Sequence, residues 1–247
     1  MHNVNCWESK FEPCECSNKL FDLIESLNKR VKIPVDVQTI KKASYYACVY
    51  HGSQIRESGD PYYYHPLEVA YLFAEYSGKK DWRYYTTDLI VIAILHDCLE
   101  DTKLTYEMIK TIFSKDVADG VQDLTRIKDG VKYEAYKTLD SLYVQGKIGL
   151  LYVKLFDRLH NAMTLDPMSR EKQIKIAGET YDHFIIYAEC LELEGLNKEL
   201  INICSKYLPI KANLLQPQEQ NHFSFALGDS QILSLAFRNE EGQKHSQ

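Results

Sequence analysis

Apolar residues along most of this chain recur with the period of an α-helix, and this constrains the fold more than any other feature. Residues 17–31 show the pattern clearly, with the spacing i, i+3, i+4, i+7 at Leu20, Leu23, Ile24 and Leu27. Only seven prolines interrupt the 247 residues, which leaves long segments free to form helices. The segment VKLFDRL has some strand propensity, but its neighbours have helical period. The sequence therefore predicts an all-α fold.

We expect about ten helices that pack into one helical bundle. Residue types mark the N-termini of two of these helices. Pro66 fits the first turn of one helix, and Thr86 or Thr87 can cap the N-terminus of the next. The predicted helices cover residues 17–31, 37–51, 65–76, 86–101, 105–113, 116–125, 132–145, 147–163, 169–193 and 196–207.

The length of the chain suits one domain with extensions. We divide it into an N-terminal extension (1–16), the helical domain (17–210) and a C-terminal tail (211–247) that is rich in Gln, Asn, Ser and Glu. The tail is too short to form a second catalytic domain. Its sequence leaves open a role as a docking segment of a protein-interaction scaffold.

Charge and hydropathy exclude several classes of partner. The chain carries a net charge of −6, whereas non-specific binding of nucleic acid or of anionic membranes requires a basic surface. The longest strongly apolar run, Leu89 to Leu95, is far too short to cross a bilayer. We therefore expect no nucleic-acid partner and no membrane association.

Cysteine usage and the N-terminus indicate the compartment. The seven cysteines are odd in number and widely spread, and Cys14-Glu15-Cys16 lacks the spacing of a zinc site. The N-terminus has no apolar core typical of a signal peptide. Together these features predict a cytoplasmic protein.

The segment HDCLEDT concentrates acidic groups behind an apolar run. On one helix, His96 and Glu100 are four residues apart, as are Asp97 and Asp101, so that all four project from one side. Ionised carboxylates this close repel one another unless a cation or a proton neutralises them. A divalent metal is the simplest solution. The alternative is a solvated helix end, although the helix dipole disfavours acids at that terminus.

A second polar stripe lies in the segment KLFDRLHNAMTL. Asp157, Asn161 and Thr164 have the spacing i, i+4, i+7 and share one face of a helix. The pair Asp157-Arg158 can also be explained as a surface ion pair. We interpret His160 as a packed or capping histidine, because helical geometry directs it away from the stripe.

These segments together resemble a known family. HGSQIRESGDPYYYHP, HDCLEDT, KLFDRLHNAMTL and KQIKIAGETYDHFIIYAECLEL follow one another in the order and with the gaps of the hydrolase domain of the RelA/SpoT homologue family. This family is a branch of the HD-domain metal-dependent phosphohydrolases. The resemblance spans about residues 40–208 and implies an HD-domain helical bundle.

The resemblance implies a metal centre and a catalytic pair. By position in the motifs, the metal ligands correspond to His65, His96, Asp97 and Asp157, and the metal that this family uses is Mn²⁺. The pair that positions and deprotonates the attacking water corresponds to Glu100 and Asp101.

The resemblance also implies contacts with the substrate. Arg56 matches a residue that packs against a guanine base. Asn161 and Thr164 match residues that hold the sugar and base region of the nucleotide. Phosphate or supporting contacts are assigned to three further residues, Ser58, Lys154 and Arg158.

By this resemblance the chain hydrolyses the 3′-pyrophosphate of the small-molecule nucleotide (p)ppGpp, and releases pyrophosphate with GDP or GTP. We expect no synthetase activity, because no synthetase-like segment follows the hydrolase motifs. The main departure is Glu57, where the family has Lys; it leaves the metal ligands intact but changes the charge near the phosphates.

Other readings stay open at this stage. A related nucleotide phosphohydrolase, such as an NADPH 2′-phosphatase, is one alternative, and a non-catalytic guanine-nucleotide-binding module is another. The sequence does not decide whether the chain forms a homo-oligomer, or whether it prefers the tetra- or the pentaphosphate.

Overall fold

The computed structural model describes residues 7–128 and 131–208. By its internal contacts the chain divides into residues 1–209 and residues 210–247. The predicted tail (211–247) lies outside the described residues, and the predicted domain boundaries stay predictions. Helix α1 already begins at Glu15, within the segment assigned to the N-terminal extension.

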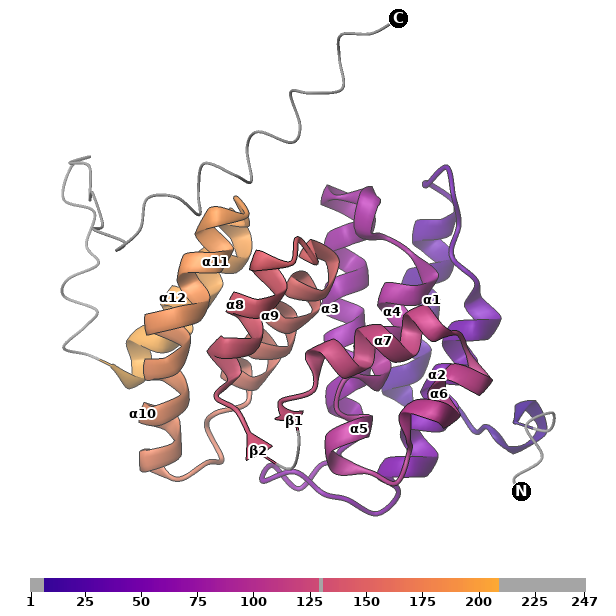
Figure 1. Cartoon of the computed structure of the whole chain (residues 1–247), viewed down its shortest axis with the longest axis horizontal. Helices are drawn as coiled ribbons and strands as arrows, with labels where there is room; N and C mark the ends of the chain where they lie inside the picture. Colours follow the sequence, from indigo (N-terminus) through magenta and orange to yellow (C-terminus); the bar gives the residue numbers. More distant parts are fainter. Residues whose placement is uncertain (1–6, 129–130, 209–247) are drawn as a thin grey trace, which may run out of the picture. The chain divides into compact units, whose positions relative to one another are not determined.

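The described part of the chain is an all-helical bundle, which confirms the predicted fold class (Figure 1). Its helices are α1 (Glu15–Asn28), α2 (Val37–His51), α3 (Tyr64–Lys80), α4 (Thr87–Leu95), α5 (Cys98–Asp101), α6 (Tyr106–Ile112), α7 (Lys115–Leu124), α8 (Ala135–Val144), α9 (Ile148–Met163), α10 (Arg170–Glu179), α11 (Ile185–Cys190) and α12 (Glu194–Tyr207). Short helical turns are η2 (Glu8–Lys10), η3 (Trp82–Tyr84) and the π-helical η4 (Thr180–Phe184).

One small exception interrupts the helices. The strands β1 (Ile127–Lys128) and β2 (Val131–Lys132) pair antiparallel between α7 and α8. None of the described helices is long and apolar enough to cross a bilayer.

The apolar run in the middle of the sequence forms the centre of the bundle. Helix α4 packs against α2, α3, α7 and α9, and every residue from Ile90 to Leu95 is buried. The Thr86 side chain accepts a hydrogen bond from the backbone N–H of Leu89 and caps this helix, as the sequence predicted. Burial on all sides explains why the run is continuously apolar and not amphipathic.

The structure differs from the predicted helix 86–101 at its most informative point. Helix α4 ends at Leu95, and α5 begins only at Cys98, so His96 and Asp97 lie at a break. Nδ1 of His96 lies 2.8 Å from the carbonyl oxygen of Ala93. The imidazole thus competes with backbone N–H groups for this acceptor. The break separates the acidic residues of α5 from the last turn of α4.

Candidate metal centre

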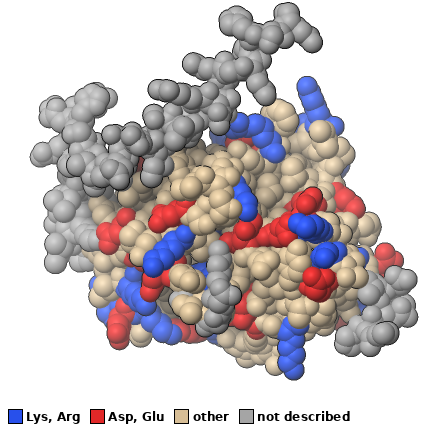
Figure 2. Space-filling model, in the orientation of Figure 1, with Lys and Arg blue, Asp and Glu red and all other residues tan. Residues whose placement is uncertain are grey.

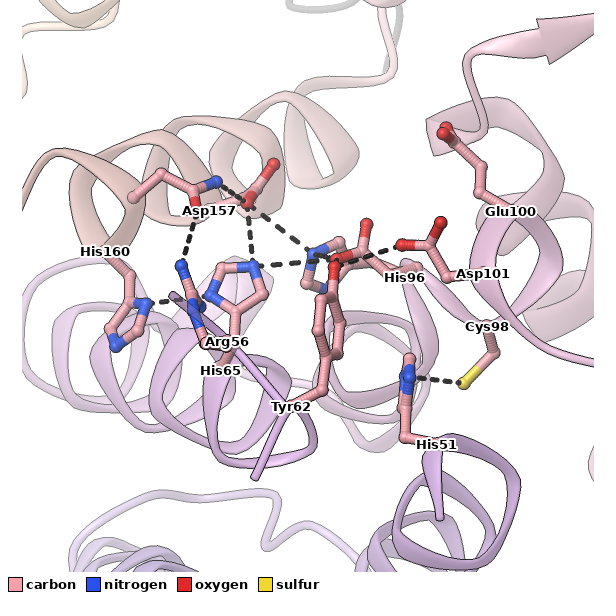
Figure 3. A network of polar contacts seen from close by, with 12 residues as sticks. His51, Arg56, Tyr62, His65, His96, Cys98, Glu100, Asp101, Asp157 and His160 are labelled. Atoms are coloured by element: carbon pink, nitrogen blue, oxygen red, sulfur yellow. Dashed lines mark hydrogen bonds and ion pairs between the residues drawn. The ribbon is translucent and has the colours of Figure 1, made fainter. Parts of the chain in front are cut away.

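Three separate segments bring two imidazoles and two carboxylates to one point. His65 comes from the first turn of α3, His96 and Asp97 from the break after α4, and Asp157 from the middle of α9 (Figure 3). His65 Nε2 is 3.2 Å from Asp157 Oδ1 and 3.6 Å from Asp97 Oδ2. His96 Nε2 is 3.2 Å from Asp97 Oδ2 and 3.6 Å from Asp157 Oδ1.

The hydrogen bonds of the two histidines show whether this cluster suits a cation. Nδ1 of His96 faces a carbonyl oxygen and therefore donates, so Nε2 of a neutral ring holds a lone pair. That Nε2 atom is buried and has no hydrogen-bond partner among the described residues. A lone pair directed at carboxylates is stable only with a positive charge between them. Ligand atoms of His65, His96 and Asp157 lie within 4.8 Å of one another and could hold a metal ion.

The pKa shifts reflect the same demand for positive charge. Burial alone would lower the pKa of His96, but the carboxylates of Asp97 and Asp157 outweigh it and raise the pKa to about 10. Burial disfavours an ionised Asp157, yet Lys154 and the two histidines hold its pKa well below the ordinary range. Burial likewise disfavours an ionised Asp97, but the charge and hydrogen bond of His96 contribute to a net lowering of the pKa of that carboxyl. The cluster therefore retains its carboxylates in the ionised form that binds a cation.

His160 is not where the sequence analysis expected it. It does not turn away from the polar site: His160 Nδ1 lies 2.8 Å from His65 Nδ1 (Figure 3). Burial lowers the pKa of His160 to about 3, which keeps the ring neutral and able to accept a hydrogen bond. His65 can then donate from Nδ1 and direct the lone pair of Nε2 at Asp157, as ligand histidines do when an outer partner fixes their tautomer.

Asp101 reaches the cluster and Glu100 does not. Tyr62 Oη lies 2.9 Å from Asp97 Oδ2 and 3.0 Å from Asp101 Oδ2. The carboxylate of Glu100 points elsewhere (Figure 3) and accepts a hydrogen bond from the backbone N–H of Arg126. The break between α4 and α5 explains the difference, because the four residues no longer share one helical face.

Arg56 meets Asn161 and Thr164, two residues of the predicted stripe, beside the metal cluster. Nη2 of Arg56 donates to Asn161 Oδ1 at 3.0 Å and to Thr164 Oγ1 at 3.2 Å. Asn161 in turn donates to Asp157 Oδ1 at 2.7 Å. Nη1 of Arg56 is buried without a hydrogen-bond partner among the described residues. This group retains a donor that an oxygen or nitrogen acceptor of a ligand could satisfy.

The three remaining predicted contact residues have different surroundings. Lys154 is buried and its Nζ lies 2.9 Å from Asp157 Oδ2. Arg158 pairs with Glu179 at 3.0 Å, so the interpretation of Asp157-Arg158 as a mutual surface ion pair is wrong. Ser58 donates to Asp60 within an exposed loop and does not line the groove described next.

A polar groove of about 410 Å³ opens over the cluster. Cationic side chains line it together with the acidic ones already described, at Arg126, Lys154, Arg158, Lys172 and Lys175. At its edge Glu57, the departure noted in the sequence, forms an ion pair with Lys172 of α10. Across the face drawn in Figure 2, basic and acidic side chains are interspersed. The groove is therefore suited to a polar, charged ligand and not to an apolar one.

Sequence reasoning missed three residues of this site. Tyr62, His51 and Gln54 lie in the quoted motif HGSQIRESGDPYYYHP but received no role. His51 stacks on Tyr62 and contacts Gln54, whose side-chain nitrogen donates to the carbonyl oxygen of Asp101. The sequence feature that could have indicated a role for His51 and Gln54 is their spacing of three residues at a predicted helix end, shortly before the predicted ligand His65.

Comparison with known proteins identifies the fold. A model of the HD domain matches residues 43–190, more than half of the chain. The chain belongs to the HD-domain family. This HD domain is related to RelA/SpoT hydrolase domains, as the motifs predicted. Its relatives include a protein named GTP pyrophosphokinase rsh from Brucella ovis, 34% identical over 194 residues, which covers 76% of this chain and 25% of the relative.

Two further comparisons concern this HD domain. A guanosine-3′,5′-bis(diphosphate) 3′-pyrophosphohydrolase from Aquifex aeolicus is 36% identical over 192 residues, 75% of this chain and 26% of that protein. The chain thus spans about a quarter of the length of these relatives. A solved structure, described as a metazoan orthologue of SpoT that hydrolyses ppGpp, aligns at 19% identity and a TM-score of 0.48 over 71% of this chain and 92% of that one.

Proposed function

We propose that this HD domain is a metal-dependent hydrolase that removes pyrophosphate from the 3′ position of guanosine tetra- or pentaphosphate. The observation that carries the proposal is the cluster of four acceptors, two imidazole nitrogens and two carboxylates, one of which is the buried Nε2 atom of His96. The name of the Aquifex relative supplies the class of substrate.

We assign the metal ligands to His65, His96, Asp97 and Asp157, and the metal to Mn²⁺. A set of nitrogen and oxygen donors without a thiolate suits a harder transition metal. When bound, the metal supplies a positive charge that lowers the pKa of a water molecule and polarises a phosphate group. The second nitrogens of both imidazoles are engaged by Ala93 and His160, which fixes the tautomers that ligation requires.

The chemistry proposed for the chain's own groups starts with Asp101. Its carboxylate lies beside the cluster at the groove and accepts a proton from the attacking water. The new P–O bond displaces the ribose 3′ oxygen, which takes up a proton as GDP or GTP leaves, and pyrophosphate is released. Glu100 was expected to share the proton transfer with Asp101. Its contact with Arg126 instead supports a role in holding the segment after α7 at the groove.

Substrate binding is assigned to the groups around the groove. Arg56 carries an unsatisfied Nη1 beside Asn161 and Thr164, and this trio is the proposed contact for the guanosine. Lys154 and Arg158 are proposed to face the phosphates, although each is paired with a carboxylate. Ser58 stays a prediction, since its hydroxyl is engaged by Asp60.

The test is product identification with purified protein. Incubation with ppGpp and Mn²⁺ should yield GDP and pyrophosphate in equal amounts, measured by ion-exchange chromatography. His96→Ala should abolish turnover, whereas His183→Ala, which removes a histidine stacked on Tyr136 outside the groove, should not. Full metal-dependent release of pyrophosphate by His96→Ala would refute the assignment.

Two further arms separate the alternatives. Release of phosphate from NADPH in place of pyrophosphate from ppGpp would favour the related phosphohydrolase. Incubation with ATP and GTP tests the expectation that this chain does not make the alarmone, and pyrophosphate transfer to GTP would contradict it.

A further inference from the structure

A series of side-chain contacts leads from a buried cysteine behind the metal cluster to the backbone of Asp101. Cys98 Sγ lies 3.7 Å from His51 Nε2, and His51 Nδ1 lies 2.8 Å from Gln54 Oε1. The side-chain nitrogen of Gln54 donates to the carbonyl oxygen of Asp101 at 2.7 Å. Because Gln54 presents its oxygen to the ring, His51 Nδ1 must donate, and Nε2 then accepts from the Cys98 thiol. Every donor points the same way, so the ring of His51 is fixed.

The fixed ring of His51 supports Tyr62. The two ring centroids lie 4.7 Å apart with an interplanar angle of 26°, a stacked arrangement (Figure 3). On the far side, the Tyr62 hydroxyl reaches both Asp97 Oδ2 and Asp101 Oδ2. A hydroxyl has a single hydrogen, so it serves one carboxylate or is shared between the two. When the hydrogen is shared, it holds the two carboxylates about one point and offsets their repulsion.

We propose that Tyr62 is a positioning residue that couples the metal-ligand carboxylate of Asp97 to the water-activating carboxylate of Asp101, and that His51 acts through it by fixing its ring. This rests on the proposed function for the role of Asp101. Partners that hydrogen-bond to a ligand carboxylate from outside the coordination sphere orient that ligand. The Tyr62 hydroxyl does so for Asp97 while contacting Asp101, so one side chain sets the relative position of metal and base.

The first test removes only the hydroxyl. Tyr62→Phe keeps the stacked ring and should lower kcat for ppGpp hydrolysis by about 10–100-fold, the usual effect of losing such an outer partner. KM should change little, because the guanosine contacts at Arg56 are untouched. The matched control is Tyr63→Phe, whose ring packs against Tyr64 and which should retain kcat. An unchanged kcat in Tyr62→Phe overturns the proposal.

A second test asks whether His51 acts through Tyr62. His51→Phe keeps an aromatic platform and His51→Leu removes it at similar size, so the Phe variant should retain the higher kcat. In a Tyr62→Phe background the difference between the two should vanish, since the hydroxyl they position is gone. Equal kcat values for His51→Phe and His51→Leu, or a difference that persists without the hydroxyl, would show that His51 does not act through Tyr62.

A third readout does not depend on turnover. Titration calorimetry with Mn²⁺ alone should show weaker binding by Tyr62→Phe, again by about 10–100-fold, while Tyr63→Phe binds like the wild type. If the wild type binds Mn²⁺ but does not hydrolyse ppGpp, the proposed function fails and this arm still tests the contact with Asp97. Equal Mn²⁺ affinities of Tyr62→Phe and the wild type would show that the Tyr62 hydroxyl does not influence metal binding through Asp97.

Discussion

At the scale of single residues, the site is defined by which atoms are left without a partner. His96 Nε2 and Arg56 Nη1 are buried side-chain nitrogens that lack hydrogen bonds among the described residues, and they lie in the metal cluster and in the proposed guanosine contact. Unsatisfied buried groups destabilise a fold by about 1–3 kcal/mol each unless a ligand completes them. The third such atom among the described residues, Asn197 Oδ1, lies in α12 away from the site, so it is the occurrence of the two nitrogens among the predicted site residues that marks the site.

Asp101 allows a residue-scale test that separates catalysis from metal binding. Asp101→Asn keeps the shape of the side chain but removes the proton acceptor, so kcat should fall by about 10²–10⁴-fold. The metal content, measured by mass spectrometry of the purified protein, should stay that of the wild type, because Asp101 is not among the four proposed ligands. Asp116→Asn, an exposed acid in the first turn of α7, is the control and should change neither quantity. Loss of metal together with activity would make Asp101 a ligand.

At the scale of elements, α4 and α7 pack closely against each other, before the break at His96 and Asp97. Gly120 of α7 lies against α4 without room for a side chain. An added Cβ would overlap the Ile92 side chain and lie 3.1 Å from its Cγ1 and 3.4 Å from Leu150 Cδ2. The close approach of the two helices therefore depends on this glycine.

This contact predicts opposite effects for two glycine substitutions. Gly120→Ala forces an extra methyl group into a packed core and should lower the free energy of unfolding by about 1–3 kcal/mol. Gly178→Ala in α10, where nothing lies within 4 Å of the added Cβ, should raise it by up to about 1 kcal/mol through helix propensity. Urea denaturation monitored by circular dichroism measures both, and a stabilising Gly120→Ala would show that the α4–α7 contact is loose.

At the scale of the whole molecule, one cation would join segments that are distant in sequence. The proposed ligands come from α3, the end of α4 and α9, and the His65–His160 contact alone spans 95 residues. A ligand that binds only the folded state stabilises it by mass action. Metal binding should therefore stabilise the fold as well as enable the chemistry.

Thermal unfolding tests this coupling. Mn²⁺ at about 100 times its dissociation constant should add about 2.7 kcal/mol of stability, which corresponds to an upward shift of about 5–10 °C for a domain of this size. Addition of EDTA should reverse the shift, measured by differential scanning calorimetry. His96→Ala should show neither effect. The same unfolding temperature for the wild type with Mn²⁺ and with EDTA would speak against a metal at this cluster.

Local pattern was enough to predict much of the molecule. Helical periodicity predicted the bundle, and the Thr86 cap was read from residue type. The predicted stripe has Asp157 and Asn161 on α9 and Thr164 at the C-cap of that helix. These features depend on neighbours within one or two turns, whose geometry the backbone fixes. The quoted motifs also pointed to the HD-domain family, which comparison then confirmed.

Other features depend on contacts between distant segments, and only the tertiary structure decided them. The break after Leu95 turned Glu100 toward Arg126, and the approach of α3 to α9 brought His160 against His65. The stacking of His51 on Tyr62 likewise joins the last residue of α2 to the segment before α3, which periodicity does not relate. Side-chain direction at such points follows from packing and hydrogen-bond competition across the bundle, and no local spacing encodes it. The sequence by itself determined the helices and the set of chemical groups; the tertiary structure decided which of those groups face one another.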